Sequence, residues 1–252
     1  MKLSIVLLSH NGLSLTRQCL QYLLPLLEIR KDVNVCVIDN GSSDNTYHIL
    51  SHEFSHNQID FVRLDSNRGV AGGRNRGIAR HPDSEYIMFL DNDTIVHVNS
   101  VVQLINFMDS HPEVGLAAPS LRGINGNIQL SFKKFPGIKE KILNLAGRKS
   151  ESPEIDSSEL MQPFYVIGAC QIFRRSLVDK VGLLDENIFF GPEDADFCIR
   201  IRREGYKVVY IPWIKIIHCW QRKSHKNPFS KISRLHIKGL FYFYRKWNRW
   251  FK

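Results

Sequence analysis

The sequence predicts an α/β protein with a mostly parallel sheet and helices on both faces. Short apolar runs without strict alternation are separated by segments in which apolar residues recur at helical spacing. The chain has 252 residues, of which 43% are hydrophobic and 23% charged, so it can bury a full core. Polar residues follow several of the apolar runs directly. In parallel sheets such positions face the ligand.

The first half of the chain gives the clearest elements. Strands are expected at residues 3–9, 33–39, 59–64 and 85–90, each a compact apolar run. A helix capped by Ser14 runs to about Leu27, and Ser43 or Asp44 caps a second helix that reaches about residue 55. Residues 69–80 are expected to form a loop that enters a helix.

The second half is less regular. We expect strands at residues 114–120, within 162–175, and at 206–211 and 215–220, with a helix at 193–204 and another closing the chain. Residues 132–160 are polar, charged and contain Pro and Ser, which indicates a variable excursion or lid.

The five cysteines are scattered, odd in number and without CxxC spacing. This pattern is typical of small buried side chains in a reducing compartment, not of a disulfide or zinc framework. The apolar run at the N-terminus is short for a signal peptide, and no run approaches the ~18 residues of a membrane span. A cytoplasmic location is therefore expected.

Positive charge is concentrated in the C-terminal tail. The net charge is +9, but residues 205–252 alone carry +12 because they contain twelve Lys and Arg and no acid. Aromatic residues interleave with the basic residues of 230–252. This favours peripheral binding to the inner face of an anionic membrane, while a closing helix whose aromatics pack on the domain is an equal alternative.

Two acids follow the fourth apolar run, in the sequence FLDNDT. Asp91 and Asp93 are separated by one residue and repel each other, a cost that Mg²⁺ or Mn²⁺ would offset while also binding a diphosphate. The alternative is a solvated turn in which Asp93 caps the next helix. Asn11 and Asp39 follow two other strands, so they are expected at the same edge of the sheet as Asp91.

A second acidic cluster lies in GPEDADF, at the expected start of a helix. Glu193, Asp194 and Asp196 suit the positive end of the helix dipole, but a carboxylate there is also a candidate general base. His218, on an apolar strand, is either a core residue or part of a metal site.

The glycine-rich segment NRGVAGGRNRGIA permits close approach of a ligand, and Arg74 within it is placed to meet phosphate. The segment does not fit GxGxxG, and the chain has no GxxxxGK[ST] sequence, so dinucleotide and P-loop sites are disfavoured.

Taken in order, SIVLLSHNG, VIDNGSSD, NRGVAGGRNRGI, FLDNDT and GPEDADFCIRIRREGYKVVYIP resemble the family 2 glycosyltransferases, inverting enzymes of the GT-A fold. The resemblance covers nearly the whole chain and is strongest to the bacterial rhamnosyl- and galactofuranosyltransferase-like members. It implies a Rossmann-like sheet flanked by helices, a smaller mixed acceptor-side half and a C-terminal helix. The implied divisions are a nucleotide-sugar half at 1–115, an acceptor and catalytic half at 116–228, and a basic-aromatic helix at 229–252.

The resemblance also implies roles for individual residues. Asp39 matches the acid that contacts the nucleotide base, and Asp91 the acid near the ribose and metal. Asp93 matches the direct metal ligand, and His218 a further ligand in some relatives. Asp194 matches the catalytic base, with Glu193 beside it. Ser9, Asn11 and Arg74 fall in segments that line the donor.

The implied reaction moves one sugar from a nucleotide-diphosphate sugar, UDP- or dTDP-linked, to a saccharide or lipid-linked saccharide hydroxyl in surface polysaccharide synthesis. Pro192 replaces an aromatic residue common in the family, and the QxxRW motif of processive synthases is absent, which favours single-sugar addition. A sugar nucleotidyltransferase would need a Gly-rich loop where SHNG stands. A nucleic-acid-binding protein would not explain three acids at strand ends, and an inactive sugar-nucleotide-binding module is the remaining alternative.

Overall fold

The computed structural model describes residues 1–133, 159–219 and 230–248, so most of the expected excursion at 132–160 lies outside the described residues. The strands within these ranges are β1 (Leu3–Ser9), β2 (Val33–Asp39), β3 (Ile59–Arg63), β4 (Tyr86–Asp91), β5 (Thr94–Ile95), β6 (Val114–Arg122), β7 (Ile128–Gln129), β8 (Phe132–Lys133), β9 (Tyr165–Val166), β10 (Cys170–Arg174) and β11 (Lys207–His218). In this part of the chain, nine strands form one sheet in the order β3-β2-β1-β4-β10-β6-β11-β5, with β7 paired to β6, while β8 and β9 pair separately.

The strands that carry the expected donor residues are parallel. β1 lies between β2 and β4, with Ser9 opposite Asp39 and Leu8 opposite Asp91. β10 is antiparallel to both β4 and β6, so it separates the regular N-terminal strands from the later ones. The predicted mostly parallel α/β sheet is confirmed.

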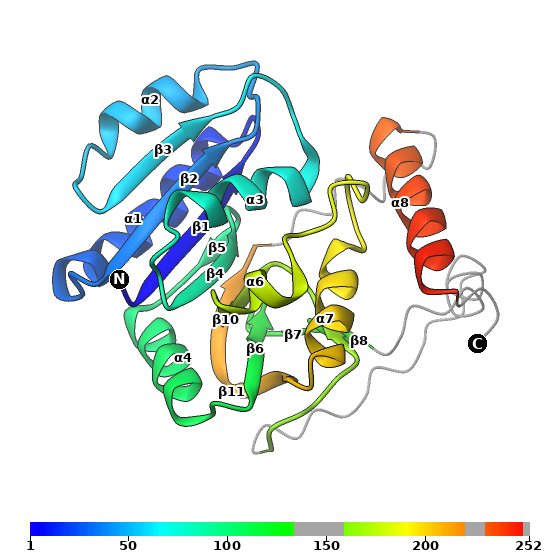
Figure 1. Ribbon diagram of the computed structural model, residues 1–252. Coiled ribbons are helices and arrows are strands. Elements are labelled where there is room, and N and C mark those ends of the chain that lie inside the picture. The colour runs from blue at the N-terminus through cyan, green and yellow to red at the C-terminus, as the bar shows by residue number, and fades with distance from the viewer. Residues whose placement is uncertain (134–158, 220–229, 249–252) are drawn as a thin grey trace.

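Helices cover both faces of the sheet (Figure 1). They are α1 (Leu13–Ile29), α2 (Thr46–Glu53), α3 (Gly69–Arg80), α4 (Val98–Ser110), α6 (Leu177–Val181), α7 (Glu193–Arg203) and α8 (Lys231–Trp247). One buried cluster joins α1, α2 and α4 to one face, and a second joins α3, α6, α7 and α8 to the other.

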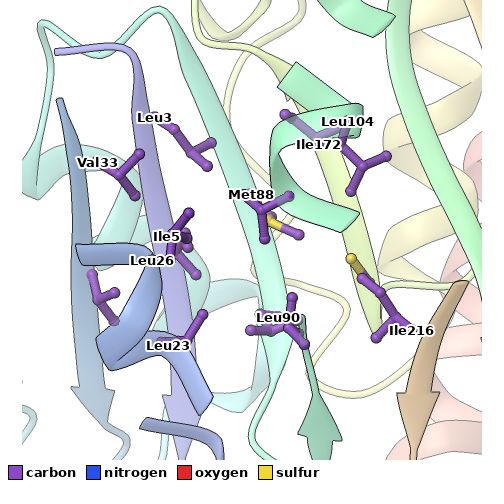
Figure 2. Close-up of a cluster of buried hydrophobic side chains, with 14 of the residues drawn as sticks. Leu3, Ile5, Leu23, Leu26, Val33, Met88, Leu90, Leu104, Ile172 and Ile216 are labelled. Carbon is purple, nitrogen blue, oxygen red and sulfur yellow. The ribbon is translucent and has the colours of Figure 1, made fainter. Parts of the chain in front are cut away.

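The alternation of side chains along β1 explains this division. Leu3, Ile5 and Leu7 are fully buried against α1, whereas Val6 points to the opposite face and packs near α3. Figure 2 shows the first cluster, in which Leu23 of α1 packs beside Ile5. Two well-filled faces fix the sheet rigidly, and its carboxyl edge is therefore a stable platform for a site.

Several local predictions differ from the structure. Ser14 does not cap α1, because the helix already begins at Leu13 and the Gly12 carbonyl accepts the Thr16 N–H. Residues 69–80 are helical throughout. The two strands expected at 206–211 and 215–220 are one strand, β11, with a register shift between Ile211 and Lys215. α4 had no counterpart among the predicted elements. All five cysteines are free thiols, and four are buried.

The closing helix α8 combines a packed face with an exposed face. Phe243 and Tyr244 are buried in the second cluster. Ile237 is 62% exposed on the same helix. Within the described ranges, we find no helix with both the length and the apolar character needed to cross a membrane.

Candidate active site

The carboxyl ends of β2, β1 and β4 place the predicted donor residues along one edge of the sheet. Neighbouring strands lie ~4.8 Å apart, so Asp39 and Asp91, which flank β1, are separated by about two strand spacings. This edge is where ligands bind in open α/β sheets.

Asp39 lies at the bottom of a buried polar network. One of its carboxylate oxygens accepts a hydrogen bond from the Ser42 hydroxyl, which in turn accepts the Asn11 backbone N–H at 2.9 Å. The other oxygen, Oδ2, has no hydrogen-bond partner in the described part of the chain and lies 3.6 Å from Arg63 Nε. A buried carboxylate oxygen without a donor suits recognition of an N–H group on a ligand.

Asn11 and Ser9 support this corner differently. Asn11 takes a positive φ of 49°, which Asn tolerates better than most residues, and its side-chain oxygen accepts the Ser43 N–H at 2.9 Å. The Ser9 hydroxyl is buried and bonds Thr16 Oγ1 at 2.8 Å. Ser9 therefore lies beneath the edge of the sheet, where it fixes the start of α1.

Asp91, Asp93 and His218 form a three-residue cluster that suits a metal ion. One ligand atom of each lies within 4.8 Å of the other two. His218 reaches the acids because the end of β11 pairs with β5, directly after Asp93. His218 Nε2 is 3.2 Å from Asp93 Oδ1. Two carboxylates and one imidazole match the ligands that Mn²⁺ accepts, and the carboxylates match those of Mg²⁺.

His218 is oriented by a residue that the sequence did not indicate. Gln129 of β7 accepts a hydrogen bond from His218 Nδ1 at 2.8 Å and returns one from its amide to the His218 carbonyl at 2.8 Å. This leaves Nε2 facing the acids, as in metal sites where the second ring nitrogen is held by an outer partner. Burial lowers the pKa of His218, but the hydrogen bond and charge of Asp93 outweigh burial and raise it.

Arg74 links this cluster to the second pair of acids. Its guanidinium is only 3% exposed and lies over the Phe89 ring, 4.8 Å from the centroid. One nitrogen donates to Asp91 Oδ1 at 2.8 Å and to the Gly168 carbonyl at 2.7 Å, while the other lies 3.8 Å from Glu193 Oε1. One buried cation therefore contacts acids from two distant parts of the chain.

Glu193 and Asp194 begin α7, as predicted, but differ in exposure. The Glu193 side chain is buried beside Arg74, whereas Asp194 is partly exposed. Burial first, and then the charge of Asp194, raise the pKa of Glu193 to about 7, although Arg74 opposes the shift. Burial also raises the pKa of Asp194, which accepts the Ala195 N–H at 2.7 Å. Asp194, the more exposed acid of the pair, is thus the one able to meet a ligand hydroxyl.

The structure brings Asp91, Asp93, His218, Arg74 and Glu193 into one connected group. Asp194 lies beside Glu193. Asp39 and Asn11 lie together on the other side of β1 from Asp91. Gln129 and the Gly168 carbonyl are the parts that sequence reasoning missed. Gly168 lies inside the segment 162–175 where a strand was predicted, and a glycine there was a weak signal for the second. Gln129 gave no signal.

Comparison with known proteins identifies the family of the chain. The family model for glycosyl transferase family 2 matches residues 4–182, well over half of the chain. The chain therefore belongs to glycosyl transferase family 2, and the predicted family is confirmed.

The curated relatives include synthases and transferases. The chain is 27% identical over 224 residues to the poly-beta-1,6-N-acetyl-D-glucosamine synthase of Staphylococcus aureus, covering 86% of this chain and 49% of the synthase. It is 21% identical over 245 residues to the N-acetylglucosaminyl-diphospho-decaprenol L-rhamnosyltransferase of Mycobacterium tuberculosis, covering 90% and 79%. The chain thus spans about half the length of the synthases that it matches.

Solved glycosyltransferases share the fold. GalNAc-T7 with UDP, GalNAc and Mn²⁺ superimposes with a TM-score of 0.70 at 17% identity, over 92% of this chain and 46% of the other. TarS 1–349 of S. aureus with UDP-GlcNAc gives 0.65 at 18% identity, over 89% and 60%. The mannosyltransferase PcManGT of Pyrobaculum calidifontis with GDP-Man and Mn²⁺ gives 0.64 at 17% identity, over 89% and 58%. The expected GT-A fold is confirmed.

Proposed function

We propose that this chain is an inverting, metal-dependent glycosyltransferase. It moves one sugar from a UDP- or dTDP-sugar to a hydroxyl of a saccharide or lipid-linked saccharide in cell-surface polysaccharide synthesis. The observation that carries the proposal is the bridge made by Arg74 between Asp91 and Glu193. It joins a cluster that suits a metal ion to a pair of acids. In transfer from a nucleotide-diphosphate sugar, the first serves the leaving diphosphate and the second the acceptor hydroxyl.

Asp91, Asp93 and His218 would hold Mg²⁺ or Mn²⁺. When bound, the ion stabilises negative charge on the departing diphosphate. Mn²⁺ is present in two of the matching glycosyltransferase structures, those of GalNAc-T7 and PcManGT. Arg74 adds a fixed positive charge beside the cluster and keeps Asp91 oriented.

Asp194 serves as the general base. Its carboxylate is partly exposed, and its raised pKa moves it toward the range in which a base removes a hydroxyl proton effectively at neutral pH. Glu193 is buried against Arg74, so its role is to orient the arginine and to position the acceptor side of the site. Direct displacement by the acceptor oxygen inverts the anomeric carbon without a covalent enzyme intermediate.

Asp39 recognises the nucleotide base through Oδ2, which has no hydrogen-bond partner in the described part of the chain. The choice of uracil or thymine rests on the family resemblance. UDP-GlcNAc in TarS supports this preference, whereas GDP-Man in PcManGT represents the competing choice. The lipid-diphosphate substrate named for the mycobacterial rhamnosyltransferase supports a lipid-linked acceptor. We assign residues 1–115 to the donor half, 116–228 to the acceptor half and 229–252 to the tail.

The test is a panel of nucleotide sugars assayed for donor hydrolysis and transfer, with Mn²⁺, with Mg²⁺ and after EDTA. Asp93→Ala should abolish transfer and weaken donor binding, because it removes a metal ligand, while Asp83→Ala, an exposed acid away from the site, should not. Full activity after EDTA would overturn the metal role. Donor binding without turnover for every sugar would favour the inactive binding module, and pyrophosphate release from a nucleoside triphosphate would favour a sugar nucleotidyltransferase.

The exposed face of α8 supports attachment to an anionic membrane. Arg234, Lys238 and Arg245 are exposed, and Ile237 lies among them at 62% exposure. Ile237, Lys238 and Arg245 lie three, four and eleven residues after Arg234, so at 3.6 residues per turn they share one side of the helix, opposite the buried Phe243. Each basic residue near an anionic surface contributes on the order of 1 kcal/mol. An apolar residue among cations suits a lipid interface better than nucleic acid.

Sedimentation with anionic vesicles tests this attachment without removing α8, whose inner face is part of the core. Exchange of Arg234, Lys238 and Arg245 for Glu should abolish pelleting at low salt. A control with Lys31, Lys180 and Lys207 exchanged for Glu has the same net charge and changes only exposed lysines elsewhere. Equal loss in both variants would mean general charge attraction and would contradict a membrane face on α8.

A further inference from the structure

The segment from Asp185 to Asp196, which carries Asp194, lies between two helices. On one side α3 contacts it: the Val70 N–H donates to the Phe189 carbonyl at 2.9 Å, and the Asn75 amide donates to Glu186 Oε1 at 2.9 Å. On the other side lies α8, drawn in orange to red beside α7 in Figure 1. α3 also carries Arg74, so the helix that contacts this segment belongs to the proposed donor side of the site.

α8 contacts the segment at two places along its length. Near its middle, Gly239 packs so closely that an added Cβ would lie 2.8 Å from the Gly191 carbonyl oxygen, and His236 Nδ1 lies 3.3 Å from the Phe190 carbonyl. The contacted residues, Phe190 and Gly191, directly precede Pro192 and the acid pair. The middle of α8 thus touches the chain just before the proposed base.

The last turn of α8 makes charged contacts. Lys246 Nζ lies 2.7 Å from Asp185 Oδ2 and 2.8 Å from Asp196 Oδ1, and Trp247 Nε1 donates to the same Asp196 oxygen at 3.0 Å. Tyr242 donates its hydroxyl to Asp185 at 3.0 Å. One lysine therefore ties together both ends of the segment that contains Asp194.

The geometry of α7 makes this tie relevant to Asp194. Residues two apart on an α-helix point roughly 200° away from each other. Asp196 is fully buried toward α8, so Asp194 is directed to the opposite side, where the Gly168 loop and Arg74 lie. A shift of Asp196 would turn the first turn of α7 and move Asp194 with it.

We propose that α8 is the brace that positions the proposed base, and that Lys246 is its positioning residue. The proposal rests on the proposed transferase function. The Lys246 ammonium fixes the distance between Asp185 and Asp196, and α3 supplies the opposing wall. The C-terminal helix thereby contributes to the acceptor side of the site without touching a substrate.

Lys246→Met keeps most of the length of the side chain and removes its charge. The fold should survive, because Asp196 retains Arg200 at 2.9 Å and Trp247, and Asp185 retains Tyr242. We expect kcat for transfer to fall about 10- to 100-fold through misplacement of the base, with the donor KM nearly unchanged. Lys246→Arg should restore most of the turnover. Lys207→Met, which breaks an exposed pair with Glu113, is the matched control.

Hydrogen exchange of residues 185–194 provides a readout that does not depend on activity. It should accelerate in Lys246→Met and not in Lys207→Met. Trp247→Phe removes the hydrogen bond to Asp196 and keeps an aromatic ring at the position where Arg203 stacks. It should show the same effects more weakly and covers the case in which Lys246→Met does not fold. Unchanged exchange in the folded variants, or faster exchange with unchanged kcat, overturns the brace. A wild-type protein that transfers no sugar overturns the proposed function instead, while the exchange result still decides whether α8 holds the segment.

Discussion

Replacing Arg74 with Met removes the cation at the centre of the site and keeps most of the packing volume over Phe89. In the wild-type protein this guanidinium bonds Asp91 and the Gly168 carbonyl and lies 3.8 Å from Glu193. The substitution leaves two acids and one carbonyl without their common partner. We expect lower stability and loss of transfer.

The magnitude follows from the exposure of the partners. Removing one member of a buried ion pair costs about 3–5 kcal/mol. The Asp91 side chain is 39% exposed, so water compensates part of its loss of the arginine. Glu193 can take up a proton, which removes its unpaired negative charge. We therefore expect about 2–3 kcal/mol at neutral pH, which lowers Tm by about 4–12 °C in a domain of this size.

Thermal unfolding followed by circular dichroism measures the effect, with metal removed so that only the protein's own charges act. Arg76→Met, an exposed arginine on the same helix, is the control. The loss should be larger at pH 8 than at pH 5, because both acids are ionised at the higher pH and lack a counter-charge. A Tm within about 2 °C of wild type at pH 8, or an equal loss at both pH values, would contradict this role of Arg74.

Three further outcomes are expected. Asp194→Asn should lower transfer by roughly 10²- to 10⁴-fold with donor affinity little changed, and Glu193→Gln should be milder; the reverse order in a transfer assay would exchange their roles. Because the folded-state pKa of Glu193 is raised to about 7 from an ordinary 4.5, the folded protein holds this proton longer than the unfolded chain. Its contribution to stability is then present below about pH 4.5 and lost as pH rises to about 7, so Glu193→Gln should flatten that part of a urea-midpoint profile, and an unchanged profile would contradict the shift. Gly168→Ala should displace Arg74, since an added Cβ would collide with its guanidinium, and its Tm and turnover should both fall; wild-type values for both would show that the loop yields instead.

Sequence pattern determined the donor edge of the sheet almost completely. Apolar runs predicted β1, β2 and β4, and the chain direction of parallel strands placed Asp39 and Asp91 at one edge. It also predicted the start of α7 at Glu193, because acids at a helix N-terminus are a local signal. These features depend on neighbouring residues, whose periodicity and charge are legible in the sequence.

Which side chains meet across the fold depends on the packing of the whole molecule. Gln129 reaches His218 over 89 positions because β7 and β11 both pair with β6, and Arg74 reaches the Gly168 carbonyl over 94 positions because β10 lies antiparallel beside β4. The same holds for Lys246, whose charge predicted a surface role but whose ammonium lies between Asp185 and Asp196. Periodicity specifies which face of an element is buried, whereas the partner on that face depends on strand order and helix packing set by the whole core.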